Sequence, residues 1–305
     1  TNNDESIIKC GEYIGTSAAG NFIDLGFEPQ FIITKKISGA GGEWRINDIM
    51  RGIVPWADAQ LDANSNAAEI TGNVTCDLTP TGFISFGSQN DSGDTYIYIA
   101  IRRPHKPATV VSDVFAIDYG SSASSTPTWD SGFPVDFGIV DGVTLGSRLT
   151  GSNNIDTANS NPGSSNSSYS WDSNVGWGKG YGSTVISYMF KRSPGFMDVV
   201  AYTGTGSTVA INHNLGVAPE MMWIKNRVDN ESWSVYHKDK GADKTMWLND
   251  SGAGITHDRF NNQDPTASVF YVKTDNAVND NGDTYVAYLF ATQPGISKVG
   301  SYTGN

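Results

Sequence analysis

Aromatic side chains within polar segments are the residues of this sequence that could most directly bind a ligand. Trp171 and Trp177 are flanked by serine, asparagine and glycine, which is typical of exposed loops. The flat face of an exposed aromatic ring offers a large contact area that can stack on a sugar. The alternative is burial in a core, which we expect for Trp44 and Trp233 because they occupy corresponding strand segments. The candidate surface-binding residues are Trp171, Trp177, Trp56, Trp247 and Tyr236.

An acidic loop at residues 275–283, with the sequence DNAVNDNGD, raises the question of calcium binding, since Ca²⁺ is held by oxygen ligands. The spacing excludes an EF-hand. With Gly282 as the loop glycine, Ala277 would be the first ligand and Tyr288 would replace the bidentate glutamate. A hairpin turn is the simpler interpretation, because Asn, Asp and Gly accommodate positive φ. We therefore expect no cofactor, with a bound Ca²⁺ as the alternative.

Sequence patterns typical of enzymes are missing. No H-E-x-x-H, G-x-S-x-G, P-loop or dinucleotide fingerprint occurs. Carboxylates are plentiful, and two of them could hydrolyse a glycosidic bond, but no pair stands out. The glycine-rich stretch GKGYG at 178–182 precedes a strand and predicts a flexible turn. We expect a protein that is not an enzyme and has no catalytic residues. The four histidines are isolated from one another: His105, His213, His237 and His257.

Composition narrows the range of partners. The chain has 305 residues and a net charge of −12, and an acidic surface repels phosphate backbones. Nucleic acid is therefore not an expected partner. No apolar run approaches the ~20 residues that span a bilayer, so membrane insertion is not expected. The polar start, Thr1–Glu5, does not resemble a signal peptide and indicates a processed or excerpted chain. Cys10 and Cys76 could form one bridge or remain two buried thiols.

One strand-like segment occurs three times and organises the chain. It reads GDTYIYIAIRRP at 93–104, GSTVISYMFKRSPG at 182–195 and GDTYVAYLFATQPG at 282–295. Each segment begins at a glycine turn, continues with aromatic and β-branched residues, and ends at a proline, which predicts a strand. Three further landmarks recur: a boundary tyrosine, a glycine before a strand, and a leucine before a polar turn. They are Tyr13, Tyr119 and Tyr202; Gly26, Gly132 and Gly216; and Leu61, Leu149 and Leu248. The gaps from tyrosine to glycine are 13, 13 and 14 residues, and those from leucine to the glycine that opens the repeated strand are 32, 33 and 34, whereas the gap from glycine to leucine is 17 in the middle copy against 35 and 32.

The spacing predicts three modules, which we name the first copy (1–104), the middle copy (105–194) and the third copy (195–295). The middle copy is reduced, because it lacks the tryptophan-containing segment between the second and third landmarks. It also contains a polar low-complexity stretch at 153–170, which predicts a long exposed loop. The links between copies are short and contain proline, so a stiff array is expected.

Within each copy, short alternating segments are separated by turn clusters, which predicts a β-sandwich. The fold class is therefore all-β: a tandem array of three β-sandwich modules, the middle one reduced, plus the first strand of a possible fourth. One turn of helix is expected at 55–61. The boundary strand at 296–305 has two explanations. It begins a further copy in a longer array, or its core Ser297–Gly304 is donated to a neighbouring subunit's sheet.

The third copy resembles modules that recur in structural proteins of tailed bacteriophages, often marine phages. The resemblance rests on YTG at 202–204, GVAPEMMWIKN at 216–226, WSVYH at 233–237, LN at 248–249 and GDTYVAYLF at 282–290. The first copy fits less closely, and the middle copy departs most because it lacks the tryptophan segment. The resemblance implies a β-sandwich in a virion component such as a tail fibre, tail tip or head fibre, and it carries no catalytic signature.

The resemblance thus implies a virion protein on the phage surface or in the extracellular space. It would adhere to the host through exposed loops. Homo-oligomers, other virion proteins and a host-surface glycan or protein receptor are the expected partners, and oligomerisation would supply avidity. Two alternatives remain: a purely structural filament or capsid-decorating protein, and an extracellular carbohydrate-binding adhesin or polysaccharide depolymerase.

Overall fold

The computed structural model describes residues 7–53, 58–120, 127–166, 168–178 and 185–304. The chain divides into two compact units, unit 1 (Thr1–Pro104) and unit 2 (His105–Asn305). Unit 1 corresponds to the first copy of the repeat, and unit 2 holds the middle and third copies. In the described residues, regular structure is nearly all strand, with one α-helix and three 3₁₀-helices: α1 (Asn276–Asn279), η1 (Gly87–Gln89), η2 (Val111–Asp113) and η3 (Arg148–Thr150).

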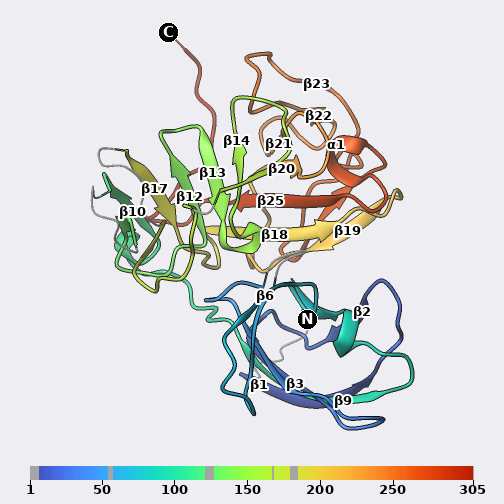
Figure 1. The fold of residues 1–305 in the computed structure, drawn as a ribbon. Coiled ribbons are helices and arrows are strands. Elements are labelled where there is room, and N and C mark those ends of the chain that lie inside the picture. The colour runs from blue at the N-terminus through green and yellow to red at the C-terminus, as the bar shows by residue number, and fades with distance from the viewer. Residues whose placement is uncertain (1–6, 54–57, 121–126, 167, 179–184, 305) are drawn as a thin grey trace. The chain divides into compact units, whose positions relative to one another are not determined.

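Unit 1 is a sandwich of two antiparallel sheets, and Figure 1 shows β1, β3 and β9 as its long curved strands. The larger sheet has the order β1-β9-β3-β4-β5-β6, and the smaller has the order β2-β8-β7. Tyr13, Ile32 and Tyr96 from the larger sheet meet Ile23 and Phe83 from the smaller one in a single core. The strands are β1 (Ile8–Ile14), β2 (Asn21–Asp24), β3 (Pro29–Lys36), β4 (Trp44–Asp48), β5 (Asp58–Asp62), β6 (Ile70–Asn73), β7 (Cys76–Thr79), β8 (Gly82–Ser85) and β9 (Thr95–Arg102).

The middle copy, in unit 2, repeats this arrangement with a smaller second layer. Its sheet has the order β10-β17-β12-β13-β14-β15, and the pair β11-β16 lies over it. The core is built from indoles: Trp129, Trp171 and Trp177, with Trp171 stacked on Trp177 at 4.6 Å between ring centroids. The strands are β10 (Phe115–Asp118), β11 (Trp129–Asp130), β12 (Phe137–Val140), β13 (Thr144–Ser147), β14 (Asn153–Asp156), β15 (Ser164–Ser165), β16 (Gly176–Trp177) and β17 (Ser187–Phe190).

The third copy has a four-stranded sheet of order β18-β25-β20-β21, and the pairs β19-β24 and β22-β23 complete it. Its core includes Met222, Ile224 and Leu289 from the sheet and Val278 from α1. Asp275 caps α1 by accepting a hydrogen bond from the N–H of Ala277. The strands are β18 (Met197–Thr203), β19 (Val209–Asn212), β20 (Met221–Asn226), β21 (Ser234–His237), β22 (Lys244–Thr245), β23 (Ile255–Thr256), β24 (Val269–Val272) and β25 (Thr284–Phe290).

The repeated strand occupies the same place in all three sheets. It is β9, β17 and β25, and each time it pairs antiparallel with the first strand of its copy on one side and the third on the other. The predicted fold class, an all-β array of sandwich modules, is confirmed. The landmark glycines Gly26, Gly132 and Gly216 adopt φ values of 76°, 75° and 76°. This left-handed conformation favours glycine, which explains why the residue recurs there.

The two halves of unit 2 pack against each other. The rings of Phe137 and Tyr288 lie 4.6 Å apart, and Trp233 donates a hydrogen bond from Nε1 to the carbonyl of Asp156 at 3.0 Å. The ammonium of Lys225 donates to the carbonyl of Ser160 at 3.2 Å. The polar stretch at 153–170 is therefore not the long exposed loop that we expected. It forms β14 and β15, buries Ile155, and receives hydrogen bonds from the third copy.

Several local predictions are wrong. Residues 58–61 belong to strand β5 and not to a helical turn, and residues 55–57 lie outside the described residues. Leu61 lies in a strand whereas Leu149 lies in η3, so these two landmarks are not equivalent. Trp233 is buried as expected, but the Trp44 side chain is 37% exposed. Cys10 and Cys76 are both free, the first exposed and the second buried.

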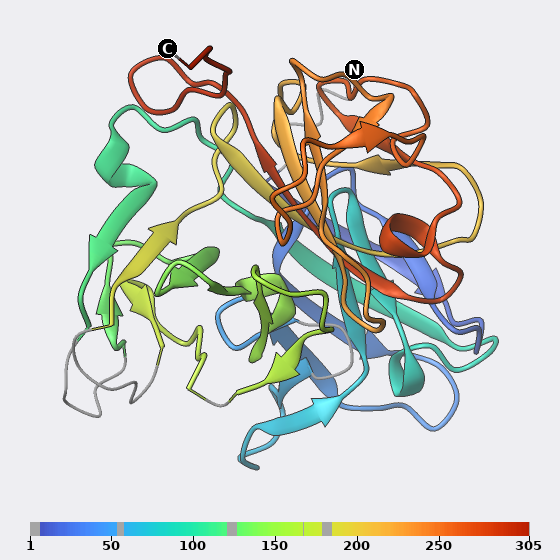
Figure 2. The same cartoon turned by 90° about the horizontal axis from the view of Figure 1, so that it is seen from above.

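The predicted boundary strand at Ser297–Gly304 is not formed. Figure 2 shows the segment after β25 as an irregular coil, and Tyr302 is 94% exposed. A strand needs a partner to satisfy its backbone groups, and this segment pairs with no strand among the described residues. None of the helices in the described ranges combines the length and the apolar character needed to cross a membrane.

Candidate functional site

Three of the five predicted surface-binding residues are buried. Trp171 and Trp177 form the core of the middle copy, and Tyr236 belongs to the core of the third copy. Their rings pack against other side chains and cannot stack on a sugar, so that prediction is wrong for them. The polar and small neighbours gave the wrong indication, because the glycines that flank Trp177, Gly176 and Gly178, lie against Trp129, where an added Cβ would clash. Trp56 lies outside the described residues, and Trp247 is half-buried beside β22, so these two stay predictions.

Unit 1 contains a polar pocket of about 210 Å³, which we call the unit 1 pocket. Its floor is set by strand register. Thr34 lies directly opposite Arg45 on β4, and Lys36 lies opposite Tyr96 on β9. Residues two apart on a strand, and residues directly opposite each other, share a face of the sheet. These four side chains therefore line the pocket together, at the end of the face that carries the core.

Two connections close the walls of the unit 1 pocket. The segment between β3 and β4 contributes Gly41, Gly42 and Glu43, and the segment around η1 contributes Ser88, Gln89 and Asp91. Gly41 has a φ of 73°, which favours glycine and allows the connection to fold back beside the sheet. The lining thus combines backbone, hydroxyl, amide, ammonium, guanidinium and carboxylate groups.

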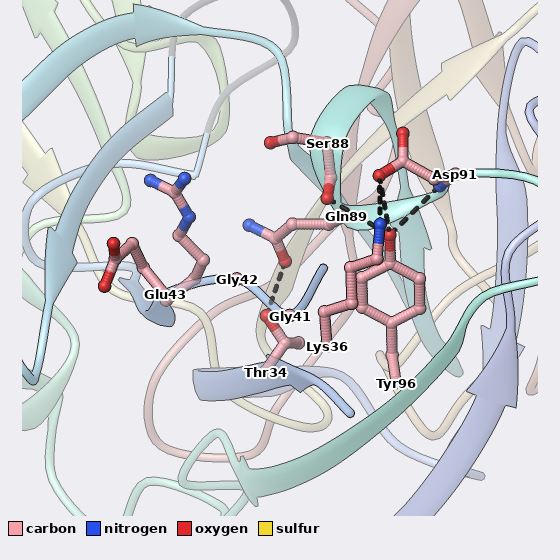
Figure 3. A pocket seen from close by; sticks show the side chains of 10 residues that line it. Thr34, Lys36, Gly41, Gly42, Glu43, Ser88, Gln89, Asp91 and Tyr96 are labelled. Atoms are coloured by element: carbon pink, nitrogen blue, oxygen red, sulfur yellow. Dashed lines mark hydrogen bonds and ion pairs between the residues drawn. The ribbon is translucent and has the colours of Figure 1, made fainter. Parts of the chain in front are cut away.

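Gln89 is the most informative residue of the unit 1 pocket. Its side chain is 3% exposed, and its Oε1 accepts a 2.7 Å hydrogen bond from the hydroxyl of Thr34. Figure 3 shows the other end of the amide, Nε2, pointing into the pocket in the direction of Glu43. This nitrogen is buried and donates to no group among the residues that the structure describes. A buried donor without an acceptor costs about 1–3 kcal/mol, so its retention calls for an explanation.

The third copy shows that the same fold can carry apolar residues at the positions of Gln89 and Thr34. Tyr13 donates from its hydroxyl to the carbonyl of Gln89 at 2.8 Å, and Tyr202 donates in the same way to the carbonyl of Val278 at 2.7 Å. Gln89 and Val278 are therefore structural equivalents. By strand register, Ile224 is the equivalent of Thr34. Because Val278 and Ile224 are core residues, the architecture does not require a polar pair at this place.

The two cations that line the unit 1 pocket, Lys36 and Arg45, are held in ion pairs. Lys36 pairs with Asp91 at 2.9 Å and also with Asp94, and Arg45 pairs with Asp62 at 3.1 Å. Hydrogen bonds from Lys36 and Ser38 hold the pKa of Asp94 below its usual value. Hydrogen bonds to Asp94 and Asp91 raise the pKa of Lys36. These two groups stay ionised at neutral pH, which suits binding through fixed charges more than proton transfer.

A cluster of three carboxylates lies in the third copy. One oxygen from each of Asp229, Asp280 and Asp283 lies within 4.8 Å of the others. Asp280 and Asp283 belong to the acidic loop found in the sequence, but Asp229 comes from the connection between β20 and β21. Oxygen ligands in this arrangement could hold a hard cation such as Ca²⁺. Strand register makes Asn226 of the third copy the equivalent of Lys36 of the first copy. Asn226 therefore stands beside this cluster as Lys36 stands beside Asp91.

Sequence reasoning missed the unit 1 pocket, although a signal for it exists in the repeat. Aligned on Tyr96 and Tyr285, the third and first copies read AVNDNGDTY and SQNDSGDTY. The substitution of glutamine for valine at one core position is visible in that alignment. The substitution of threonine for isoleucine lies on another strand, outside the aligned stretch, and is identified by strand register. Its meaning depends on the contact between Thr34 and Gln89, which lie far apart in the sequence.

The chain matches a protein family described as a domain of unknown function, DUF7483, over residues 5–104 and 134–305. The match covers most of unit 1, including every lining residue of the unit 1 pocket, and most of unit 2. No curated protein matches the chain significantly.

Proposed function

The chain belongs to the DUF7483 family, and we propose that it is a non-enzymatic virion protein of a tailed bacteriophage that adheres to the host surface through the unit 1 pocket. The observation that carries the binding function is Gln89. Its amide nitrogen is buried, aimed into the pocket and without an acceptor among the described residues. A ligand oxygen at this point would complete its hydrogen bonding and recover the cost of the unpaired donor.

The scaffold supports an adhesive role. Three copies of one sandwich follow each other, each with the repeated strand paired between the first and third strands of its copy. A β-sandwich holds its loops on a stiff base, which favours binding because few groups must be ordered on contact. The resemblance of the third copy to modules of tailed-phage structural proteins supports the virion assignment and a surface or extracellular location. In a homo-oligomer, several weak sites would act together and raise the overall affinity.

The chemistry of the unit 1 pocket favours binding over catalysis. A general acid or base works best when its pKa lies near the working pH. The pKa of Asp94 is lowered and that of Lys36 is raised, so their mutual contact moves both values away from neutrality. Their ion pairs also fix the side chains that frame the lining. A pocket of this kind is suited to recognise a polar ligand and release it unchanged.

A self-assembling filament is the second candidate function, and one observation favours it. Ser297–Gly304 ends in SYTG, and in the third copy the corresponding AYTG closes strand β18. Tyr202 of that strand packs against the core, whereas Tyr302 is 94% exposed. The segment thus has the sequence of a first strand, and another sheet could pair with it. Removal of residues 297–305 would lower the assembly state measured by light scattering if the segment is donated.

An array of bacterial surface polysaccharides tests the adhesive function. We expect the labelled full chain to bind a subset of these glycans, and the double variant Thr34→Ile with Gln89→Val to lose that binding. Ile224→Val, a mild change at the equivalent position of the third copy, serves as the matched control and should bind like the unchanged chain. Equal binding by the double variant and the unchanged chain would show that the unit 1 pocket is not the adhesive site.

A further inference from the structure

We propose that the unit 1 pocket binds one uncharged, hydroxyl-rich sugar residue of a surface polysaccharide. This proposal rests on the adhesive function above and names the class of ligand for the same site. Four observations carry it: the hydrogen-bonding groups of the lining, the balance of its charges, its volume, and its replacement by core residues in the third copy.

The hydrogen-bonding groups of the pocket require a ligand that both accepts and donates. The Nε2 of Gln89 is a buried donor that needs an acceptor. The carboxylates of Glu43 and Asp91 can only accept when ionised. One oxygen of each already accepts, in Glu43 from Asn64 and in Asp91 from Lys36, and the remaining lone pairs can accept from a ligand donor. A hydroxyl group supplies one donor and two acceptor lone pairs, and a sugar ring carries several of them in fixed directions. A sugar ring therefore satisfies groups of opposite character in one small space.

The charges of the lining select against an ionised ligand. Two cations, Lys36 and Arg45, stand against two anions, Glu43 and Asp91. Both cations are already engaged, Lys36 with Asp91 and Asp94, and Arg45 with Asp62. A carboxylate or phosphate would have to compete with these aspartates for its counter-charge while approaching Glu43 and Asp91. An ammonium group would meet Lys36 and Arg45, so a neutral ligand has the lowest desolvation cost.

The size of the pocket limits the ligand to a single ring. Pockets for drug-sized ligands usually measure about 300–1,000 Å³. The unit 1 pocket, at about 210 Å³, lies below that range. We infer that one residue of a polysaccharide enters the pocket while its neighbours remain outside.

The third copy provides an internal comparison. It builds the same strands and the same tyrosine-to-carbonyl contact, but Ile224 and Val278 fill the positions of Thr34 and Gln89. Replacing two hydrogen-bonded partners by apolar groups of suitable shape can be neutral for stability. The polar pair in the first copy is therefore explained by a ligand better than by folding.

Titration of the full chain with small sugars tests the proposal. The probes are the methyl glycosides of glucose, galactose and mannose, compared with glucuronic acid, N-acetylneuraminic acid and inorganic phosphate, and binding is followed by NMR. We expect at least one neutral glycoside to shift the amide resonance of the Gln89 side chain. The double variant Thr34→Ile with Gln89→Val should weaken this binding by about tenfold or more, because it removes the buried hydrogen bond to the ligand. Ile224→Val should leave it unchanged.

The outcomes separate the two proposals. If the polysaccharide array is bound through the pocket but the acidic sugars or phosphate bind there more tightly than every neutral glycoside, the adhesive function stands and the neutral-sugar proposal is wrong. If no probe binds the folded chain, or if the double variant binds the glycosides as well as the unchanged chain does, the proposal is also wrong. Binding of a neutral glycoside in the pocket without any array binding would support the ligand class and contradict the adhesive function.

Discussion

The hydroxyl of Thr34 donates a 2.7 Å hydrogen bond to Oε1 of Gln89, and this contact fixes which end of the buried amide faces the unit 1 pocket. Both side chains are almost completely buried, and both stand where the third copy has apolar residues. The pair is thus a polar insertion into an apolar layer. Its energetic behaviour should differ from that of an ordinary pair of core residues.

We expect Thr34→Ile alone to destabilise unit 1 by about 1–3 kcal/mol, because Oε1 of Gln89 then loses its donor while remaining buried. The double variant Thr34→Ile with Gln89→Val should recover most of this loss, since no unpaired polar group remains. Urea unfolding of the three proteins gives the coupling between the positions as a double-mutant cycle. Additive losses in the double variant would contradict the interpretation.

Lys36 should control the ionisation of Asp94. The lysine donates to this carboxylate, and the contact is the first cause of the lowered pKa of Asp94. In Lys36→Met we expect that pKa to rise toward the ordinary value of an aspartate. A carboxylate whose pKa is lowered by folding stabilises the folded chain at pH values above its unfolded-state pKa. This stabilisation is lost as the pH falls through the folded-state pKa. The variant should therefore be less stable than the unchanged chain at neutral pH, and its stability should fall less as the pH is lowered.

Carboxyl carbon NMR across a titration measures the pKa of Asp94 directly. Lys9→Met, which removes a half-buried lysine that donates to the carbonyls of Asp24 and Leu25 elsewhere in unit 1, is the control and should leave the titration of Asp94 unchanged. An unaltered pKa in Lys36→Met would mean that Ser38 alone sets the ionisation, through its 2.8 Å hydrogen bond.

Local sequence patterns predicted the strands better than they predicted which aromatic side chains are exposed. The repeated strand, its bounding turns and the landmark glycines follow from side-chain period and backbone conformation, which are encoded within a few residues. Burial of Trp171 and Trp177 depends instead on how distant segments stack, so their polar neighbours gave the wrong indication. The leucine landmarks failed for the same reason, because Leu149 lies in η3 whereas Leu61 lies in a strand.

The unit 1 pocket could not be predicted from local sequence because its lining comes from two stretches that lie far apart in the sequence, 34–45 and 88–96. Thr34 and Gln89 meet only when β3 and η1 are placed by the complete sheet. Neither residue is unusual by itself, since threonine is common in strands and glutamine is common near turns. Comparing equivalent positions between the copies would have singled out the pair, but only the structure shows that their side chains touch.

Gly138 is predicted to be irreplaceable in the middle copy. A Cβ added there would lie 2.4 Å from Cζ2 of Trp177, which is closer than any side chain allows. We expect Gly138→Ala to cost about 1–3 kcal/mol through overpacking of the indole core. Gly163→Ala is the matched control, because its added Cβ would meet ordinary contacts of 3.5 Å or more. Thermal unfolding of both variants tests this, and equal stability would show that the indole core can yield.

His213 should make the third copy sensitive to mild acid. Burial lowers the pKa of this histidine from 6.5 to about 4. Its Nδ1 accepts a hydrogen bond from the N–H of Leu215 at 3.2 Å, and its Nε2 lies 3.1 Å from the carbonyl of Thr266, an arrangement that suits the neutral ring. Between pH 6.5 and 4 the unfolded chain binds the proton and the folded chain does not, so stability falls as the pH falls.

The size of this effect is about 2 kcal/mol between pH 7 and pH 5. Urea unfolding of unit 2 across that interval, compared with the variant His213→Gln, isolates the contribution of the histidine. The variant should be less stable at pH 7 and should show a flatter dependence on pH. A parallel dependence in the two proteins would assign the acid sensitivity to other groups.

The packing of the middle copy on the third predicts where the chain can be divided. Cutting after Pro104 separates two compact units, each with its own core, so fragments 1–104 and 105–305 should each fold cooperatively. Cutting after Pro194 instead would expose Tyr288 and Trp233, which are fully buried in unit 2 and contact the middle copy through Phe137 and Asp156. Loss of this burial costs about 2–3 kcal/mol for each side chain, so fragment 195–305 should be markedly less stable or aggregate. Circular dichroism melts and size-exclusion chromatography compare the three fragments, and a fragment 195–305 as stable as 105–305 would contradict the importance of this interface.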